Sequence, residues 1–163
     1  MQQSNKFEII KMVFIIVCAF LLQTYLVPVL EINIWRPDLI LIVVLLIGYK
    51  YGAISATLVG FFIGIFQDSL SASPIGISSF SNCIIGFLAG SIREYKFKAN
   101  TAYLFTIILI LFHGLLFYLI YQTKTEASYT YLIFARVFPN TIYTFIIWLI
   151  TSYFFKSLME EST

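Results

Sequence analysis

The stretch that decides the fold runs from residue 52 to residue 92 and reads GAISATLVGFFIGIFQDSLSASPIGISSFSNCIIGFLAGSI. It holds two apolar segments, residues 52–70 and 74–92, on either side of a short turn that contains serine and proline. Within each segment small or short polar residues recur at every fourth position, and such positions share one face of a helix. We therefore expect two membrane-spanning helices in close contact, because small side chains let membrane helices approach each other.

The two expected packing faces consist of four residues each. They are Gly52, Ala56, Gly60 and Gly64 on the first helix, and Ser78, Asn82, Gly86 and Gly90 on the second. The alternative is that these faces line a substrate cavity. Ser73 followed by Pro74 also indicates the start of a helix, with Ser73 as the N-cap and Pro74 at the first helical position.

The composition of the whole chain agrees with a membrane environment. Of 163 residues 60% are hydrophobic and 11% are charged, and the mean hydropathy is +0.92. A soluble domain carries about 25% charged residues, so too few polar residues remain here to cover a surface in water. The expected fold class is an all-α integral membrane protein, a single transmembrane domain over residues 1–163 in contact with the lipid bilayer. The net charge of +2 gives no reason to expect a nucleic-acid partner.

Six segments are apolar enough to be considered as membrane spans, for which about 20 residues are needed. They are residues 9–30, 38–49, 52–70, 74–92, 102–121 and 129–155. The first resembles a signal peptide, but it continues without a small-x-small cleavage site, so we expect it to remain as a helix. The second is the shortest. We predict a bundle of six transmembrane helices.

The distribution of basic residues predicts the orientation of this bundle. With six crossings and both termini in the cytoplasm, the inner segments hold Lys6, Lys11, Lys50, Arg93, Lys96, Lys98 and Lys156. The outer loops, residues 31–37, 71–73 and 122–128, hold Arg36 and Lys124, and Arg136 lies within the sixth segment. This is the excess of positive charge expected on the cytoplasmic side. If the second segment did not cross, the excess would disappear.

Three charged residues lie near the outer ends of the expected helices. They are Asp38, Asp68 and Arg136. A charge at that depth is costly unless it is paired, so we hypothesise that Asp68, with or without Asp38, neutralises Arg136 or forms a partner site with it. The alternative is that each side chain reaches water separately. For His113, in the middle of the fifth segment and at a depth similar to Asn140, we expect a hydrogen bond to a neighbouring helix rather than a proton relay.

The sequence contains no recognisable catalytic, cofactor-binding or metal-binding arrangement. Cys18 and Cys83 lie in apolar runs, and a single histidine makes a zinc site improbable on sequence grounds. Residues 76–79 lack the glycine after serine that intramembrane serine proteases have, and residues 64–68 lack the close glycine–aspartate pair of the aspartyl proteases. We therefore expect a protein that is not an enzyme and needs no cofactor.

Three pieces of the chain, taken together, resemble a known family. They are Arg36-Pro37-Asp38-Leu39-Ile40, Tyr51-Gly52 with the run 60–70, and Ser73-Pro74-Ile75-Gly76 with the small residues that follow as far as Gly90. In order, spacing and chain length they are similar to the bacterial rod shape-determining membrane protein family MreD. The specific part of the resemblance covers residues 36–92.

The resemblance implies a non-enzymatic scaffold in the bacterial inner membrane, within the elongation machinery (the elongasome) that builds the peptidoglycan side wall and sets cell shape. It implies an MreC-type membrane protein as partner and, through it, a peptidoglycan synthase and transpeptidase and indirectly an actin-like filament. It also implies a fold like that of the substrate-binding subunits of energy-coupling importers. Such a subunit, of a vitamin-type transporter, is the alternative function. Those subunits commonly have an alanine-x-x-x-alanine contact in the first helix, where this chain has only Cys18 and Ala19 as small residues.

Overall fold

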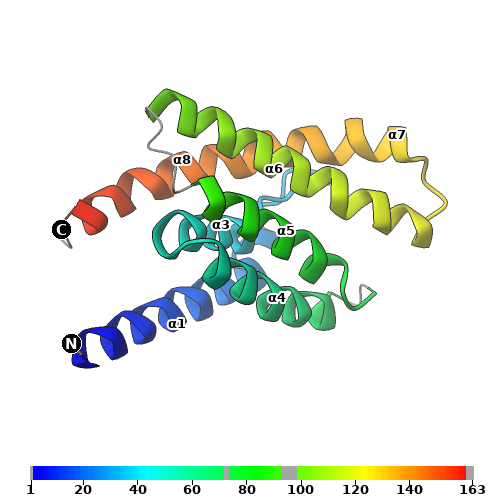
Figure 1. The fold of residues 1–163 in the computed structure, drawn as a ribbon. Coiled ribbons are helices and arrows are strands. Elements are labelled where there is room, and N and C mark those ends of the chain that lie inside the picture. Colours follow the sequence, from blue (N-terminus) through cyan, green and yellow to red (C-terminus); the bar gives the residue numbers. More distant parts are fainter. Residues whose placement is uncertain (1, 72–73, 93–98, 161–163) are drawn as a thin grey trace.

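The computed structural model describes residues 2–71, 74–92 and 99–160. Apart from one isolated backbone bridge, between Ile32 and Trp35, the regular structure in these residues is helical (Figure 1). The α-helices are α1 (Gln2–Tyr25), α2 (Val27–Leu30), α3 (Leu39–Tyr51), α4 (Ala53–Leu70), α5 (Ile77–Ile92), α6 (Ala99–Tyr121), α7 (Tyr129–Leu132) and α8 (Phe138–Glu160). A 3₁₀ turn (Gln122–Lys124) follows α6, and a π-helical segment (Ile133–Val137) joins α7 to α8. The prediction of an all-helical chain is confirmed.

Each of the six predicted segments is helical, and three of them differ in detail. Segment 129–155 consists of α7, the π-helical segment and α8. Segment 9–30 divides into α1 and α2 at Leu26, because Pro28 cannot donate the hydrogen bond that a continuous helix needs there. Segment 74–92 begins as a helix only at Ile77. The prediction that Pro74 occupies the first helical position was therefore wrong, and Ser73 lies outside the described residues.

Three helical stretches are long and apolar enough to cross a membrane. They are α4, the run Thr101–Lys124 and the run Tyr129–Tyr153. Three shorter apolar helices accompany them, namely Ile10–Tyr25, Leu39–Tyr51 and Ile77–Ile92. This set of helices is that of a multi-pass membrane protein.

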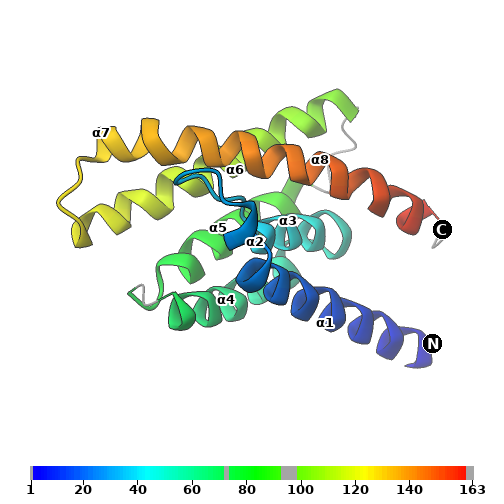
Figure 2. The same cartoon turned by 180° about the vertical axis from the view of Figure 1, so that it is seen from behind.

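The helices are arranged in three tiers (Figures 1 and 2). α6 and α8 form one outer tier, α3 and α5 the middle tier, and α1 and α4 the other outer tier. The N- and C-termini lie at the same end of the molecule, and α7 lies at the opposite end.

α3 is the central helix of this arrangement. Every residue from Ile40 to Gly48 is buried, as expected for a helix that is apolar on all sides. Its side chains join those of α5, α6 and α8 in one core, in which Leu45, Ile85, Leu109 and Trp148 are buried. The segment with the weakest length signal in the sequence is thus the one that most other helices surround.

α4 and α5 touch backbone to backbone along the two small-residue faces. A Cβ atom added to Gly60 would lie 2.7 Å from the carbonyl oxygen of Asn82, and one added to Gly64 would overlap the backbone of Ser78 and Ser79. Cβ contacts this short do not occur in folded proteins without a shift of one partner. Glycine is therefore required at both positions by the neighbouring helix.

The glycines of α5 meet the other half of α4 in the same way. A Cβ atom on Gly86 would lie 2.6 Å from the carbonyl oxygen of Ala56, and one on Gly90 would overlap the backbone of Gly52 and Ala53. The structure thus brings the two faces together in an antiparallel register, with the first small residue of α4 against the last of α5. This is helix packing of the small-residue kind.

Replacing Gly64 with alanine tests this contact. We expect Gly64→Ala to lower the stability of the purified chain by roughly 1 to 3 kcal/mol or more, because the added methyl group overlaps backbone atoms that cannot rotate away. The thermal unfolding midpoint in detergent measures the effect. Leu58→Ala, on an exposed position of the same helix, is the matched control. Equal midpoints for the two variants would contradict the packing.

Candidate functional site

Asp68 joins the end of α4 to the beginning of α5. Its side chain is fully buried, and its carboxylate accepts hydrogen bonds from the backbone N–H of Gly76 at 2.7 Å and of Ser78 at 3.1 and 3.2 Å. N–H groups at a helix start have no partner within the helix, and a negative charge there also interacts favourably with the helix dipole. Gly76 has φ +109°, a conformation that is readily adopted only by glycine.

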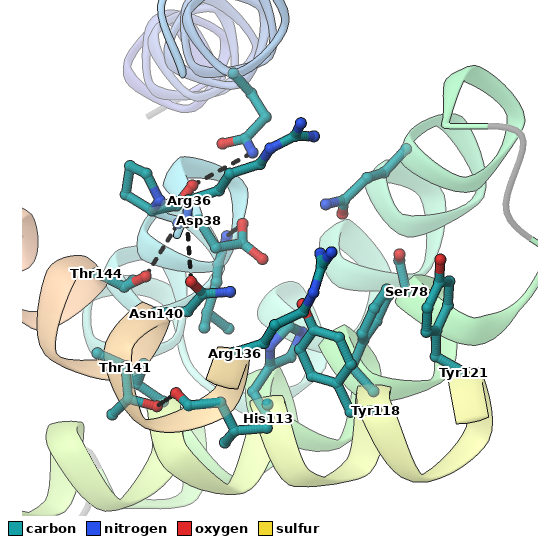
Figure 3. A pocket seen from close by; sticks show the side chains of 18 of the residues that line it. Arg36, Asp38, Ser78, His113, Tyr118, Tyr121, Arg136, Asn140, Thr141 and Thr144 are labelled. Atoms are coloured by element: carbon teal, nitrogen blue, oxygen red, sulfur yellow. Dashed lines mark hydrogen bonds between the residues drawn. The ribbon is translucent and has the colours of Figure 1, made fainter. Parts of the chain in front are cut away.

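Among the described residues Asp68 and Arg136 form no ion pair within 4.0 Å, and the bonds of the Asp68 carboxylate that the structure shows are to backbone N–H groups at the start of α5. Asp68 is also too deeply buried to contact a partner protein. Arg136 instead lies beside the hydroxyl group of Tyr118, and its guanidinium points into a cavity (Figure 3).

One wall of this cavity is the loop of residues 31–38, which α8 holds in place. The side-chain oxygen of Asn140 accepts a hydrogen bond from the backbone N–H of Arg36 at 3.0 Å, and the hydroxyl of Thr144 accepts one from the N–H of Asp38 at 3.0 Å. Asn140 and Thr144 are four residues apart and so lie on one face of α8. Polar side chains of α8 thus satisfy backbone groups that the loop leaves without partners.

α1 and α8 supply further bonds to the same connection. The side-chain oxygen of Gln23 accepts from the N–H of Leu39 at 2.8 Å, and its amide nitrogen lies 3.5 Å from the carbonyl oxygen of Pro37. The hydroxyl of Tyr143 donates to the carbonyl of Leu30 at 2.8 Å. The connection is therefore held by hydrogen bonds from α1 and α8, which are far apart in the sequence.

The same loop, residues 31–38, also forms a hydrogen bond to the segment that carries Arg136. Pro139 has no N–H, so the carbonyl of Ala135, four residues earlier, has no α-helical donor. The indole N–H of Trp35 donates to this carbonyl at 3.1 Å. The chain here is π-helical from Ile133 to Val137, a local widening that is frequent at functional sites.

These contacts place Asp38 and Arg136 around one cavity of about 300 Å³ (Figure 3). Asp38 is also the N-cap of α3, where one of its oxygens accepts from the N–H of Leu41 at 2.9 Å. A second basic residue at the cavity, Arg36, forms an ion pair with Glu31 at 2.7 Å. This hydrogen bond lowers the pKa of Glu31 and raises that of Arg36, so both side chains stay charged at neutral pH.

His113 lies deeper in the same cavity. It is 7% exposed, and its ring stacks on that of Phe117 with centroids 6.4 Å apart. Its Nε2 atom is buried and has no hydrogen-bond partner among the residues that the structure describes. The expected hydrogen bond from this nitrogen to a neighbouring helix is therefore not formed.

The cavity lies between the end of α1, the start of α3, α6 and the start of α8, and is also lined by the end of α4 and the π-helical segment. Asp38 and Arg136 were identified in the sequence, whereas Gln23, Tyr118 and Tyr121, which also line the cavity, were not. The available signal was that each is a polar residue close to the outer end of an apolar segment. Across the described part of the chain, no group of three His, Cys, Asp or Glu side chains could hold a metal ion.

Comparison with known proteins gives one match. The family model for rod shape-determining protein MreD matches residues 4–161. This is nearly the whole chain and extends well beyond residues 36–92, which carried the resemblance in the sequence. No curated protein and no solved structure matches the chain.

A double-mutant cycle tests the separate roles of Asp68 and Arg136. We expect Asp68→Asn to cost about 1 kcal/mol, because asparagine keeps one acceptor oxygen for the N–H groups of α5 but loses the charge. Arg136→Gln should lower the stability independently. The loss of stability in the double variant should then equal the sum of the two single losses to within about 0.5 kcal/mol. Unfolding midpoints of the four proteins in detergent provide the measurement. A coupling well above this value would restore the direct pair.

A second cycle tests how the carbonyl of Ala135 is satisfied. Trp35→Phe should destabilise the chain by about 0.5 to 1.5 kcal/mol, because the partly exposed carbonyl of Ala135 loses its indole donor. In the Pro139→Ala background the same substitution should cost less, since alanine restores an N–H within reach of that carbonyl. Thermal unfolding of the four proteins measures both effects. The same loss in both backgrounds would show that Trp35 acts through packing alone.

Proposed function

We propose that this chain, which belongs to the MreD family of rod shape-determining proteins, is a scaffold protein. It would act in the machinery that synthesises the peptidoglycan side wall. Family membership makes it a multi-pass membrane protein of cell shape that acts without catalysis. The finer proposal is that it binds an MreC-type membrane protein in the bacterial inner membrane. Through that partner it would connect to a peptidoglycan synthase and transpeptidase, and indirectly to an actin-like filament. The match over residues 4–161 carries this proposal.

The described structure supports a protein that works in the plane of the membrane. Its resolved connections are short, and large apolar side chains are exposed along the helices, for example Phe14 on α1, Phe62 on α4 and Leu104 on α6. Such surfaces contact lipid or the helices of other membrane proteins. We infer that partners are bound chiefly through helix faces.

The arrangement also supports the proposed topology of six crossings with both termini in the cytoplasm. An even number of crossings requires both termini on one side, and they lie at the same end of the molecule (Figures 1 and 2). α3 has 13 residues and is about 20 Å long at 1.5 Å per residue, less than the roughly 30 Å of the hydrocarbon core. The bonds from α1 and α8 to the loop before it would allow that loop to enter the membrane.

For the MreC-type partner we propose the outer end of α4 and the beginning of α5. Asp68 is internal there and holds the two helices together. The accessible residues include Leu70 and Ile75, whose side chains are 64% and 73% exposed, together with Ser69 and Ser71. A tip with both apolar and hydroxyl side chains exposed suits a transmembrane helix of a partner as it leaves the membrane.

The alternative function, a substrate-binding subunit of a vitamin-type importer, has the cavity in its favour. The family match favours the cell-shape function over it. The likeness in fold to such subunits stays a prediction.

Depletion of the chain in a rod-shaped host tests the function. We expect the cells to become round and to recover when the wild-type chain is restored. A photo-crosslinking residue at Ile75 should capture the MreC-type protein, whereas the same residue at Ile54, exposed at the other end of α4, is the matched control and should not. Unchanged cell shape together with vitamin auxotrophy would favour the transporter instead. Capture from Ile54 alone would move the partner surface to the inner end.

A further inference from the structure

We propose that the cavity between α1, α3, α6 and α8 binds a zwitterionic group, with its anionic end at Arg136 and its ammonium end at Asp38. The anionic end would be a phosphate or a carboxylate. This binding site goes beyond the scaffold function and does not depend on which partner protein is bound.

The balance of charge in the cavity is the first argument. Arg36 is paired with Glu31, which leaves Arg136 and Asp38 as the other charged side chains of the lining. In the part of the chain that the structure describes, these two form no ion pair within 4.0 Å. Each charge would therefore be stabilised by an opposite charge on a ligand.

The same balance selects the class of ligand. An anion alone would be attracted by Arg136 and repelled by Asp38, and a cation alone would meet the reverse. A molecule that carries both charges can satisfy both side chains and brings no net charge into a region of low dielectric constant. The cavity is thus complementary to a zwitterion.

Hydrogen-bonding groups around the two charges agree with this assignment. Asn140 uses its side-chain oxygen for the backbone of Arg36, so its amide nitrogen is directed towards the cavity, on the same side as the guanidinium of Arg136 (Figure 3). Both are donors suited to a phosphate or carboxylate. At the other subsite, one oxygen of Asp38 accepts from Leu41, and the second oxygen remains as an acceptor for an ammonium group.

His113 supplies an independent observation. Its Nε2 atom is buried in the cavity lining and has no partner among the described residues. Buried polar atoms are normally hydrogen-bonded, so this nitrogen points to a polar group that the described residues do not supply. A ligand that extends from the two charges towards His113 would provide it.

The size of the cavity limits the ligand. About 300 Å³ is at the lower end of the range for small-molecule sites, enough for a phosphoethanolamine headgroup or a free amino acid. The two share the required chemistry and differ in source. A lipid headgroup would enter from the outer leaflet, in the orientation proposed above, and a free zwitterion from the aqueous phase.

Native mass spectrometry of the purified full-length chain tests the site. The chain is offered phosphatidylethanolamine and phosphatidylglycerol in equal amounts, and its thermal midpoint is measured separately with glycerophosphoethanolamine and with free amino acids. The variants are Arg136→Gln and Asp38→Asn, of which the second keeps the N-cap hydrogen bond. Lys124→Gln and Glu126→Gln remove exposed charges outside the cavity lining and are the matched controls.

We expect the wild-type chain to retain phosphatidylethanolamine over phosphatidylglycerol, or to be stabilised by free amino acids if the source is aqueous. Arg136→Gln should weaken either binding roughly tenfold or more, as expected for loss of a charged hydrogen bond. Asp38→Asn should shift the lipid preference towards phosphatidylglycerol, because a repulsive carboxylate is removed. A purely structural role of Asp38 would not reverse a preference.

Two results would overturn the proposal. The first is equal retention of both lipids by the wild-type chain together with no stabilisation by glycerophosphoethanolamine or free amino acids, and the second is equal losses in the control variants. If Arg136→Gln does not fold, Arg136→Lys and the wild-type competition between the two lipids decide the question. Cell shape is not measured in these experiments, so their failure would leave the scaffold function standing.

Discussion

The structure depends on one constraint, that backbone polar groups outside regular helix must find partners within the protein when lipid surrounds it. Asp68 meets this requirement for the start of α5, and Asn140, Thr144 and Gln23 meet it for the loop before α3. Trp35 meets it for the carbonyl that Pro139 leaves without a donor. Most of the distinctive polar residues in the half of the bundle away from the two termini are explained in this way.

Those backbone bonds also determine which side chains remain for other roles. Asp68 is bound to α5 and forms no ion pair with Arg136 among the described residues. Asp38 keeps one oxygen that its capping bond does not use, and Arg136 is held in a π-helical segment that directs it into the same cavity. The polar cavity is thus a consequence of the hydrogen bonds that hold the helix ends.

The helices α3, α4 and α5 form a closely packed part of the bundle, because α4 and α5 are in close contact and α3 is central. Gly60, Gly64, Gly86 and Gly90 leave no space for a side chain between α4 and α5, and α3 is buried against them. Such a framework fits the proposed scaffold function, which requires partner helices to be held in a defined arrangement. The cavity beside this part would then be available for a small ligand without disturbing the framework.

The sequence by itself determined the membrane class, the position of the six apolar helices, the two small-residue faces and the family. These are local or periodic properties, such as hydropathy over a window or a residue at every fourth position, and they do not depend on which helices meet. The tertiary structure alone decided that α3 is central, that α5 begins at Ile77, that Asp68 binds backbone rather than Arg136, and that Asp38, His113 and Arg136 share a cavity. The Asp68 bonds join residues eight and ten positions apart, and the others depend on contacts between residues tens of positions apart. In both cases many pairings of polar groups are chemically possible, and only the packing of the helices selects one.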